Sequence, residues 1–344
     1  MTVKVGVMGY GTIGARLAQG VSLQKDMELV GVADIAPTLT VRALKARGMP
    51  HRLYCVDKEK ASGLENAGIP VSGSADDLLG QVDIVLDAAP GGIGAKNKQL
   101  YMKHNLPAIF QGGEKGGVAD VFFHGYANYE KGLGKKYLLL TSCNTTGLIR
   151  TVDCLDRAFG IEKVAVTIIR RCADPGDIHR GYVDLAKVDP VPTHQAVDLM
   201  EIMPHIKATG VLVHVPITHG HIITVIATPK RTVTKEDVLK EFSAHPRIQV
   251  VRIADGFSTN TSLFQFSRFT HRPAADMYEV ALYEETVAFI GNDIVYAIFI
   301  PQEAVTIPET IDGIRASLKM QTDRLEAVSM TNRHLGLEPK KNLY

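Results

Sequence analysis

The stretch TSCNTTGLIR (141–150) places one thiol, Cys143, among small hydroxyl and amide side chains. The apolar run 137–140 before it predicts a buried strand, and the apolar spacing of residues 145–155 predicts a helix after it. A thiol at a helix N-terminus lies at the positive end of the helix dipole, near free N–H groups, which lowers its pKa. Asn144 and nearby backbone N–H groups can hold the oxyanion formed when a thiolate attacks a carbonyl. The sequence therefore predicts thiol chemistry at Cys143.

The alternative for Cys143 is a small core residue, because free cysteine is among the most buried residue types. We expect that environment for the other three cysteines, Cys55, Cys154 and Cys172. Four cysteines without a CxxC pair indicate neither a disulfide scaffold nor a zinc site.

Two histidines in THGH (218–221) offer a base for the thiol. His219 and His221 stand two residues apart at the start of the predicted strand 221–229, so we expect them to share one face of that strand. A nucleophilic thiol is activated by an adjacent base. A histidine pair can also form half of a metal site, but no matching cysteine or carboxylate cluster accompanies this one. The pair therefore predicts a base rather than a metal site.

Basic side chains gather in the segment RRCADPGDIHR, and His194 lies nearby in the loop PTHQ (192–195). Guanidinium groups suit phosphate, so the segment predicts an anion site. The alternative is a solvated basic loop paired with its acidic neighbours. The basic members are Arg170, Arg171, His179 and Arg180, and the acidic members are Asp174, Asp177 and Asp184.

A glycine-rich turn follows the first predicted strand. The apolar run 3–8 predicts a strand buried on both faces, and residues 13–21 continue with helical spacing. Between them Gly9, Gly11 and Gly14 form GxGxxG. These glycines allow a tight turn and a close approach of the backbone to pyrophosphate, which the helix N-terminus favours. Strand, turn and helix together predict a dinucleotide site.

Asp34 ends the second predicted strand, 27–34, about twenty residues after the glycines. A carboxylate there accepts hydrogen bonds from the adenosine ribose and repels a 2′-phosphate, which favours NAD over NADP. The alternative is that Asp34 only caps the turn into the next helix. Arg42 and Lys45 on that helix could still receive a 2′-phosphate.

The remaining strands suggest two architectures. In the first half, the glycine-bearing loops PGGIG and QGGEKGG follow predicted strands and fit a nicotinamide pocket at their carboxyl ends. From about residue 160, longer strands with polar alternation and surface helices such as 234–242 indicate a largely antiparallel sheet with helices on one side. The other predicted strands are 82–90, 106–110, 137–141, 163–171, 208–217, 277–283 and 293–300.

The predicted fold class is therefore α/β plus α+β. Residues 1–142 are expected to form a Rossmann-type doubly wound sheet that binds NAD(P), and residues 143–305 a catalytic domain with a mostly antiparallel sheet. Pro308 begins a final helix, and residues 306–344 are expected to pack back on the first domain. A chain of 344 residues, 45% hydrophobic, is long enough for two cores.

Charge and hydropathy exclude several partners. The 38 Lys and Arg residues against 37 Asp and Glu give no global field for nucleic acid or an anionic membrane, so a small-molecule partner is expected. The N-terminus carries no apolar signal segment, and no apolar run reaches the length of a membrane span. We therefore expect a cytoplasmic protein.

Several of these segments together resemble archaeal glyceraldehyde-3-phosphate dehydrogenases. The likeness runs from Val3 nearly to the end of the chain. FQGGEK, and a histidine placed at HGH, are typical of the archaeal branch. The segments are GYGTIG (9–14), FQGGEK (110–115), SCNTT with the arginine of GLIRT (142–151), the RR doublet (170–171), HGH (219–221) and an ending similar to PE-IDAIRA (308–316).

The resemblance implies phosphorylating, NAD(P)-dependent oxidation of D-glyceraldehyde 3-phosphate to 1,3-bisphosphoglycerate by a homotetramer. It makes Cys143 the nucleophile and His219 the base. Besides the glycines and Asp34, it implies cofactor contacts at Thr12, Ile13, Gly113, Arg171 and Gln302. The substrate contacts that it implies are Ser142, Cys143, Asn144, His194 and Gln195.

Two positions depart from the family pattern. Gln195 stands where the family usually has a second histidine at a substrate-phosphate site, and Asp34 stands where some relatives that favour NADP have lysine. Two other functions remain open. One is a semialdehyde or acyl-phosphate dehydrogenase of the aspartate-semialdehyde type, which uses the same cysteine, and the other is a non-catalytic NAD-binding regulatory protein.

Overall fold

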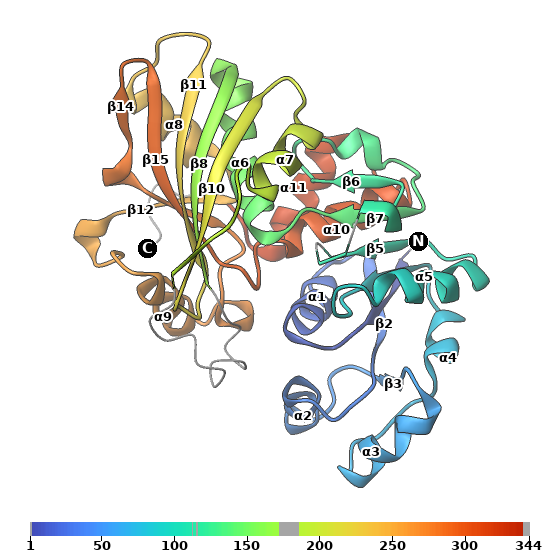
Figure 1. The fold of residues 1–344 in the computed structure, drawn as a ribbon. Coiled ribbons are helices and arrows are strands. Elements are labelled where there is room, and N and C mark those ends of the chain that lie inside the picture. Colours follow the sequence, from blue (N-terminus) through green and yellow to red (C-terminus); the bar gives the residue numbers. More distant parts are fainter. Residues whose placement is uncertain (1, 112, 115, 172–185, 340–344) are drawn as a thin grey trace. The chain divides into compact units, whose positions relative to one another are not determined.

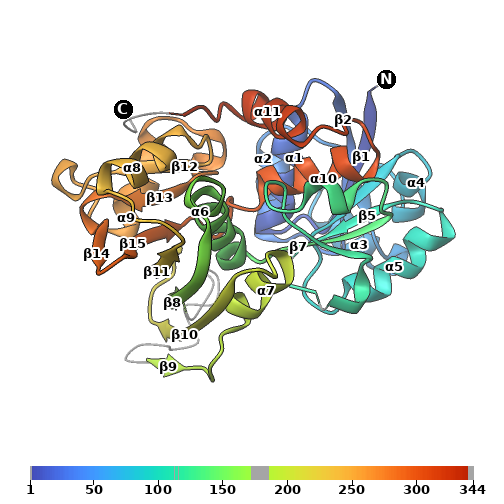
Figure 2. The same cartoon turned by 90° about the horizontal axis from the view of Figure 1, so that it is seen from above.

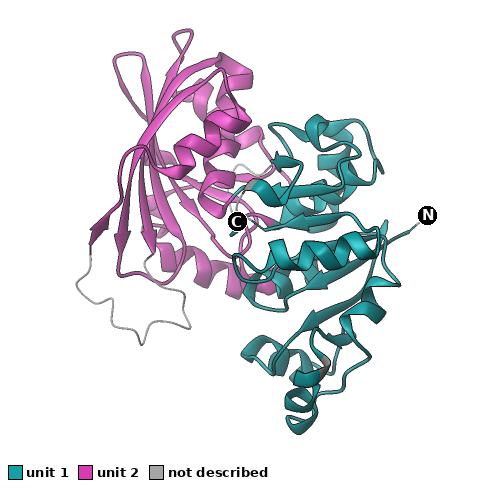
Figure 3. Cartoon of the chain, turned by 45° about the vertical axis from the view of Figure 1, so that its right-hand side comes forward, with its two compact units in different colours: residues 1–141, 307–335 teal, residues 142–306, 336–344 magenta. Residues whose placement is uncertain are grey.

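The structure is a computed structural model that describes residues 2–111, 113–114, 116–171 and 186–339. The chain divides into two compact units (Figure 3). Unit 1 comprises residues 1–141 and 307–335, and unit 2 comprises residues 142–306 and 336–344. The sequence-based boundaries were 1–142 with 306–344, and 143–305.

Unit 1 is built on a seven-stranded parallel sheet in the order β3-β2-β1-β4-β5-β7-β6 (Figure 1). The strand order reverses at β1, so the carboxyl ends of β1 and β4 form the switch point at which such sheets bind ligands. The strands are β1 (Val3–Met8), β2 (Met27–Asp34), β3 (Leu53–Cys55), β4 (Ile84–Asp87), β5 (Ala108–Phe110), β6 (Val121–Phe123) and β7 (Tyr137–Leu140).

Helices α1 and α10 pack closely in unit 1 (Figure 2). A Cβ at Gly20 of α1 would come within 2.8 Å of Ile307 of α10, so the glycine permits this approach. The end of the chain therefore packs against the first helix of the same unit. The helices of unit 1 are α1 (Thr12–Ser22), α2 (Leu39–Ala46), α3 (Ala61–Asn66), α4 (Ala75–Leu79), α5 (Gly94–Lys103), α10 (Ile307–Ser317) and α11 (Arg324–Leu335).

Unit 2 contains a mixed sheet in the order β12-β13-β15-β11-β8-β10-β9, with β14 paired to β15. Only the pairs β8–β10 and β12–β13 are parallel among the described strands. The strands are β8 (Ile161–Arg171), β9 (Lys187–Val188), β10 (Lys207–Val215), β11 (His221–Pro229), β12 (Ile248–Val251), β13 (Val280–Tyr283), β14 (Ala288–Ile290) and β15 (Asp293–Ile300).

Helix α6 packs on β8 and β11 and contacts α7 and α8 on either side. The helices of unit 2 are α6 (Cys143–Phe159), α7 (His194–Ile202), α8 (Lys235–Ala244) and α9 (Asn260–Phe269). The predicted fold class is confirmed, including the helices at the end of the chain that pack on the first unit.

Arg150, the arginine of GLIRT, holds unit 2 together from inside α6. Its side chain is fully buried, and its Nη1 and Nη2 donate to the carbonyls of Arg247, Tyr278 and Val305 at 2.6–3.3 Å. These carbonyls come from three separate segments, so one buried guanidinium group joins all three. The Arg247 carbonyl also accepts from the Val280 N–H at 3.0 Å.

Replacing Arg150 with methionine should lower the free energy of unfolding by at least about 3 kcal/mol, because three carbonyls in the interior of unit 2 lose a hydrogen bond from a charged group. Arg157→Met is the matched control on the same helix. Its side chain is 44% exposed and pairs with Asp153, so a change below about 1 kcal/mol is expected. Chemical denaturation measures both, and equal losses would contradict the role of Arg150.

Candidate active site

Cys143 is the first residue of α6, and Ser142 is its N-cap. The Ser142 backbone is extended (φ −62°, ψ 163°), and its Oγ accepts a hydrogen bond from the Thr145 N–H, one of the amides that a helix start leaves free. The buried strand β7 ends at Leu140, only two residues earlier. The predicted position of Cys143, after a strand and at a helix start, is confirmed.

The imidazole ring of His221 contacts the thiol. Its Nε2 lies 3.6 Å from the Cys143 Sγ, and the ring is almost fully buried. The backbone N–H of Arg171 donates to Nδ1 at 3.1 Å. Because Nδ1 accepts, the neutral ring carries its proton on Nε2, facing the sulfur. His221 is therefore placed as a hydrogen-bond donor to the sulfur.

The two histidines of HGH do not share a strand face. Strand β11 begins at the second of them, because Gly220 has φ +66° and a Cβ there would lie 2.3 Å from the Phe299 ring. His219 lies outside the strand, edge-on to the Phe264 ring at 5.1 Å, with its Nδ1 2.8 Å from the Thr218 Oγ1. The prediction of a common face is wrong, because a left-handed glycine interrupts the alternation on which it relied.

Burial raises the pKa of the Cys143 thiol, against the opposing effects of Arg170, the Asn144 backbone amide and Arg171. Burial, helped by Arg171 and Arg170, holds the pKa of His221 well below its usual range. The prediction that the helix start lowers the thiol pKa is therefore wrong in its net direction, because desolvation of the sulfur exceeds the helix contribution. In this structure a thiol faces a neutral imidazole.

Arg170 stands between two histidines in the sheet. It pairs in register with His221 of β11 on one side and His214 of β10 on the other, so the three share a face. The His214 Nε2 lies 2.9 Å from the Asp189 Oδ2, and Asp189 also pairs with Lys187. The rest of the predicted basic segment, His179 and Arg180 with Asp174, Asp177 and Asp184, lies outside the described residues, as does Cys172.

His194 and Gln195 begin α7. Gln195 is buried; its Nε2 donates to the His194 Nε2 at 2.8 Å, and its Oε1 accepts from the Thr193 hydroxyl. The amide thus fixes the His194 ring, leaving its proton on Nδ1. Partial burial and the nearby Arg170 lower the pKa of His194.

Arg171 is held by its own neighbours. Its Nη1 donates to the carbonyl of Thr218 at 2.8 Å and lies 3.5 Å from the Glu303 carboxylate. Gln302 follows β15, and its side chain is close enough to His221 to oppose the lowering of that pKa. Both side chains implied as cofactor contacts thus lie near the thiol and imidazole in unit 2.

The glycine turn of unit 1 leaves room for a dinucleotide. A Cβ at Gly14 would lie 1.8 Å from the carbonyl oxygen of Gly9, and Gly9 itself has φ +89°. At Gly11, the N-cap of α1, an added Cβ would meet nothing within 4 Å. Thr12 and Ile13 are the first residues of α1. The turn therefore exposes backbone at a helix N-terminus, which fits a pyrophosphate.

The Asp34 carboxylate holds this turn. Its Oδ2 accepts from the Tyr10 N–H at 2.8 Å, and its Oδ1 accepts from the Ile35 N–H at 2.7 Å. The capping function that we considered as the alternative is therefore present, although each carboxylate oxygen can accept a further hydrogen bond. Arg42 and Lys45 instead donate to backbone carbonyls.

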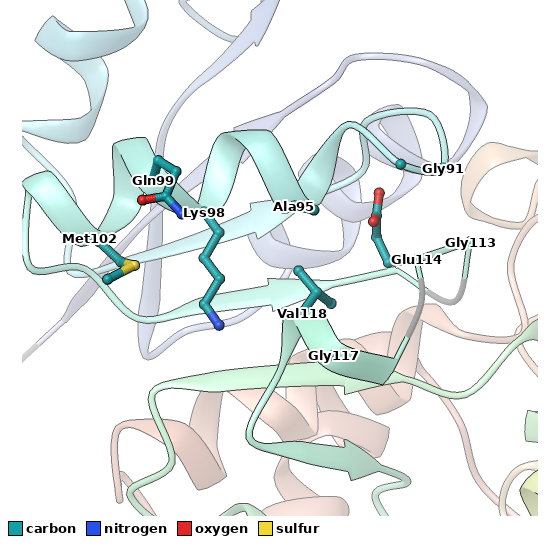
Figure 4. A pocket seen from close by; sticks show the side chains of 10 residues that line it. Gly91, Ala95, Lys98, Gln99, Met102, Gly113, Glu114, Gly117 and Val118 are labelled. Carbon is teal, nitrogen blue, oxygen red and sulfur yellow. The ribbon is translucent and has the colours of Figure 1, made fainter.

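The two glycine loops lie together in unit 1, around a cavity of about 770 Å³ between them and α5 (Figure 4). Both PGGIG and QGGEKGG contribute to its lining, and the prediction that they form a nicotinamide pocket stays a prediction. The lining residues are Gly91, Gly92, Ala95, Lys98, Gln99, Met102, Gly113, Glu114, Gly117 and Val118.

A glycine turn that fits a dinucleotide, and a thiol beside a neutral imidazole, define a class of cofactor-dependent oxidoreductases that react through cysteine. Residues 142–277 match the family model described as glyceraldehyde 3-phosphate dehydrogenase, C-terminal domain. The chain belongs to the glyceraldehyde-3-phosphate dehydrogenase family.

Curated relatives match almost the whole chain. Glyceraldehyde-3-phosphate dehydrogenase of Thermococcus kodakarensis is 42% identical over 338 residues, and that of Pyrococcus abyssi 41%, each covering 98% of this chain and 99% of the relative. The enzyme of Methanoregula boonei is 37% identical over 342 residues, 99% of both chains. The resemblance to the archaeal branch is confirmed.

Among the described residues, every helix is too short or too polar to span a membrane.

Three polar residues near the thiol were missed from the sequence. His214 pairs in register with Arg170, and Asp189 lies 2.9 Å from the His214 Nε2. Asp198 of α7 accepts a hydrogen bond from Thr145, two residues after Cys143. Each is an isolated residue in an otherwise ordinary strand, loop or helix. No spacing signal connects them, because only the packing of α7 and β10 brings them to the site.

Proposed function

We propose that this chain catalyses the phosphorylating oxidation of D-glyceraldehyde 3-phosphate to 1,3-bisphosphoglycerate, with NAD(P) and inorganic phosphate. The observation that carries the proposal is the Cys143 Sγ at a helix start, 3.6 Å from the His221 Nε2, in a chain 37–42% identical to relatives named for this activity. No such support exists for the semialdehyde alternative.

Cys143 is the proposed nucleophile. Its S–H bond breaks as the sulfur bonds to the aldehyde carbon, and the proton ends on the former carbonyl oxygen, giving a thiohemiacetal. A bound nicotinamide dinucleotide would supply the hydride acceptor, and the hydroxyl proton of the adduct would pass to solvent as the thioester forms. Phosphate oxygen then bonds to the acyl carbon as the carbon–sulfur bond breaks, and the Cys143 thiolate leaves.

His221 is the proposed donor in these steps. Its Nε2–H stabilises the thiolate and then the oxygen that develops on the former aldehyde carbon. The alternative is the sequence-based assignment of His219 as a base, which stays a prediction. The two assignments predict different outcomes for His221→Ala and His219→Ala, because only the variant of the catalytic histidine should lose most of its activity.

The phosphate groups are proposed to bind at Arg170 and His194. Arg170 carries the charge, and His194 presents Nδ1–H because Gln195 holds Nε2. Gln195 would then act through His194, since its buried amide is occupied. Ser142 and Asn144 stay proposed substrate contacts, and the homotetramer and the cytoplasmic location stay predictions.

NAD is the proposed preferred cofactor. The glycines, Thr12, Ile13, Asp34, Gly113, Arg171 and Gln302 are the proposed contacts. Asp34 repels a 2′-phosphate, and Arg42 and Lys45, the cations on α2, already hydrogen-bond to carbonyls.

Steady-state kinetics with purified protein test the function. We expect kcat/KM for glyceraldehyde 3-phosphate to exceed that for aspartate semialdehyde, and turnover to require inorganic phosphate. We also expect kcat/KM for NAD to exceed that for NADP by at least about tenfold (~1.4 kcal/mol). Phosphate-independent turnover would exclude the phosphorylating mechanism. Absence of turnover with glyceraldehyde 3-phosphate would exclude the function.

A further inference from the structure

A chain of three hydrogen-bonded side chains connects α7 to the start of α6. The Thr145 Oγ1 donates to the Asp198 Oδ2 at 2.8 Å and lies 2.9 Å from the Ser142 Oγ. The Thr145 backbone N–H donates to the same Ser142 Oγ at 3.4 Å. The chain thus ends at the residue next to Cys143.

The charge on Asp198 decides which way these hydroxyl protons point. An ionised carboxylate only accepts, so the single Thr145 hydroxyl proton is given to Asp198. The Thr145 oxygen then accepts the Ser142 hydroxyl proton. Ser142 is left with a lone pair, and no proton, for any group that binds beside Cys143.

Protonating Asp198 can reverse the chain. A neutral Asp198 O–H donates to the Thr145 oxygen, the Thr145 hydroxyl donates to Ser142, and the Ser142 proton becomes free. The reversal needs only one proton, gained by Asp198 from solvent. Ser142 would then be a donor where it was an acceptor.

The surroundings of Asp198 place this switch near neutral pH. Burial raises its pKa to about 6, opposed by the hydrogen bond from Thr145 and assisted by the charge of Glu201 on the same helix. Helix α7 packs on α6 and β10. From α6 the facing group is the neutral Thr145, and no charged side chain of β10 contributes to the shift.

We propose that ionised Asp198 is a positioning residue that, through Thr145, fixes the Ser142 hydroxyl as a hydrogen-bond acceptor for a substrate hydroxyl beside Cys143. The inference rests on the proposed function for the identity of that substrate, glyceraldehyde 3-phosphate, which carries a hydroxyl next to its aldehyde. No role in bond making is assigned to Asp198.

The kinetic test compares wild type with Asp198→Ala across about pH 5 to 8. The ratio of their kcat/KM values for glyceraldehyde 3-phosphate should be about 3–10 at pH 8, the worth of one oriented hydrogen bond. The ratio should fall toward 1 below pH 6, where Asp198 is protonated in wild type and the Ser142 hydroxyl is no longer fixed as an acceptor. Taking the ratio cancels the titration of His194 and His221. A ratio independent of pH overturns the proposal.

Two further variants guard against a merely structural effect. Asp198→Asn keeps the side-chain shape but cannot ionise, so its profile should lack the inflection near pH 6. In a Thr145→Val background, which cuts the chain, Asp198→Ala should change kcat/KM less than about twofold. A Thr145→Val background in which Asp198→Ala keeps its full effect overturns the transmission through Thr145.

Unfolding tests Asp198 without any substrate. Since the folded pKa of Asp198, about 6, lies above its ordinary value of 3.8, the protonated carboxyl stabilises the fold fully below pH 3.8. This stability is lost as the pH rises through 6. Wild type should therefore lose stability relative to Asp198→Asn between about pH 4 and 6. A difference in unfolding free energy between the two proteins that does not change with pH would overturn the switch. Inactivity of wild type with glyceraldehyde 3-phosphate would overturn only the proposed function.

Discussion

Cys143→Ser should lower kcat with glyceraldehyde 3-phosphate by at least about 10³-fold while leaving the fold intact. Serine keeps the N-terminal position in α6 and nearly the same volume. Its hydroxyl ionises far less readily than a thiol, and its alkoxide is a poorer leaving group in the final step. The loss should appear in kcat rather than KM, because substrate contacts remain.

Cys154→Ser is the matched control, since Cys154 lies in the same helix and its Sγ donates to the Glu241 carbonyl at 3.6 Å. Burial raises the pKa of Cys154 to about 12, which leaves it inert at ordinary pH. We expect this variant to stay within about twofold of wild type. Similar losses in both variants would contradict a special role for Cys143.

Alkylation with limiting iodoacetamide measures the reactivity of the Cys143 thiol directly. Burial raises the pKa of Cys143 above its ordinary value of 9.0, so in the substrate-free protein its alkylation rate should still be rising at pH 9. It should nevertheless exceed the rate at Cys154, because Arg170 and Arg171 oppose the rise of the Cys143 pKa, whereas Glu241 and Asp153 add to the rise of the Cys154 pKa. Equal labelling of the cysteines would favour a structural thiol.

Strands with strong apolar patterning could be predicted closely from sequence. Residues 221–229 and 293–300 coincide with β11 and β15, which are neighbours in the middle of the unit 2 sheet. Short or exposed elements were missed, such as β9, whose two residues are both exposed, and β14. Their pairing partners, not their own residues, make them strands.

The candidate site shows the same limit. Cys143 could be found because strand, thiol and helix follow one another along the chain. The direction in which the Cys143 pKa shifts could not be predicted, because the sequence shows the helix start but not how much protein covers the sulfur. The choice between His219 and His221 depended on the backbone of Gly220, and Asp198 reaches the site only through helix packing.

His221→Ala should lower kcat/KM by about 10²- to 10⁴-fold, whereas His219→Ala should lower it by less than about tenfold. The physical reason is the contacts of each ring: the His221 Nε2 faces the Cys143 Sγ at 3.6 Å, while the His219 ring packs against Phe264 and Thr218. An equal or larger loss in His219→Ala would restore the sequence-based assignment.

His221→Gln separates a donor from a base, because the glutamine amide can place an N–H near the Nε2 position but cannot take a proton. If His221 acts as the donor that the Arg171 N–H to Nδ1 hydrogen bond implies, His221→Gln should recover at least about tenfold of the activity lost in His221→Ala. The low pKa of His221 adds a second expectation: the ring is already neutral at pH 7, so its titration should produce no rise in rate between about pH 6 and 8. If His221→Gln is as slow as His221→Ala, the ring must accept the thiol proton, which requires the Arg171 hydrogen bond to break first.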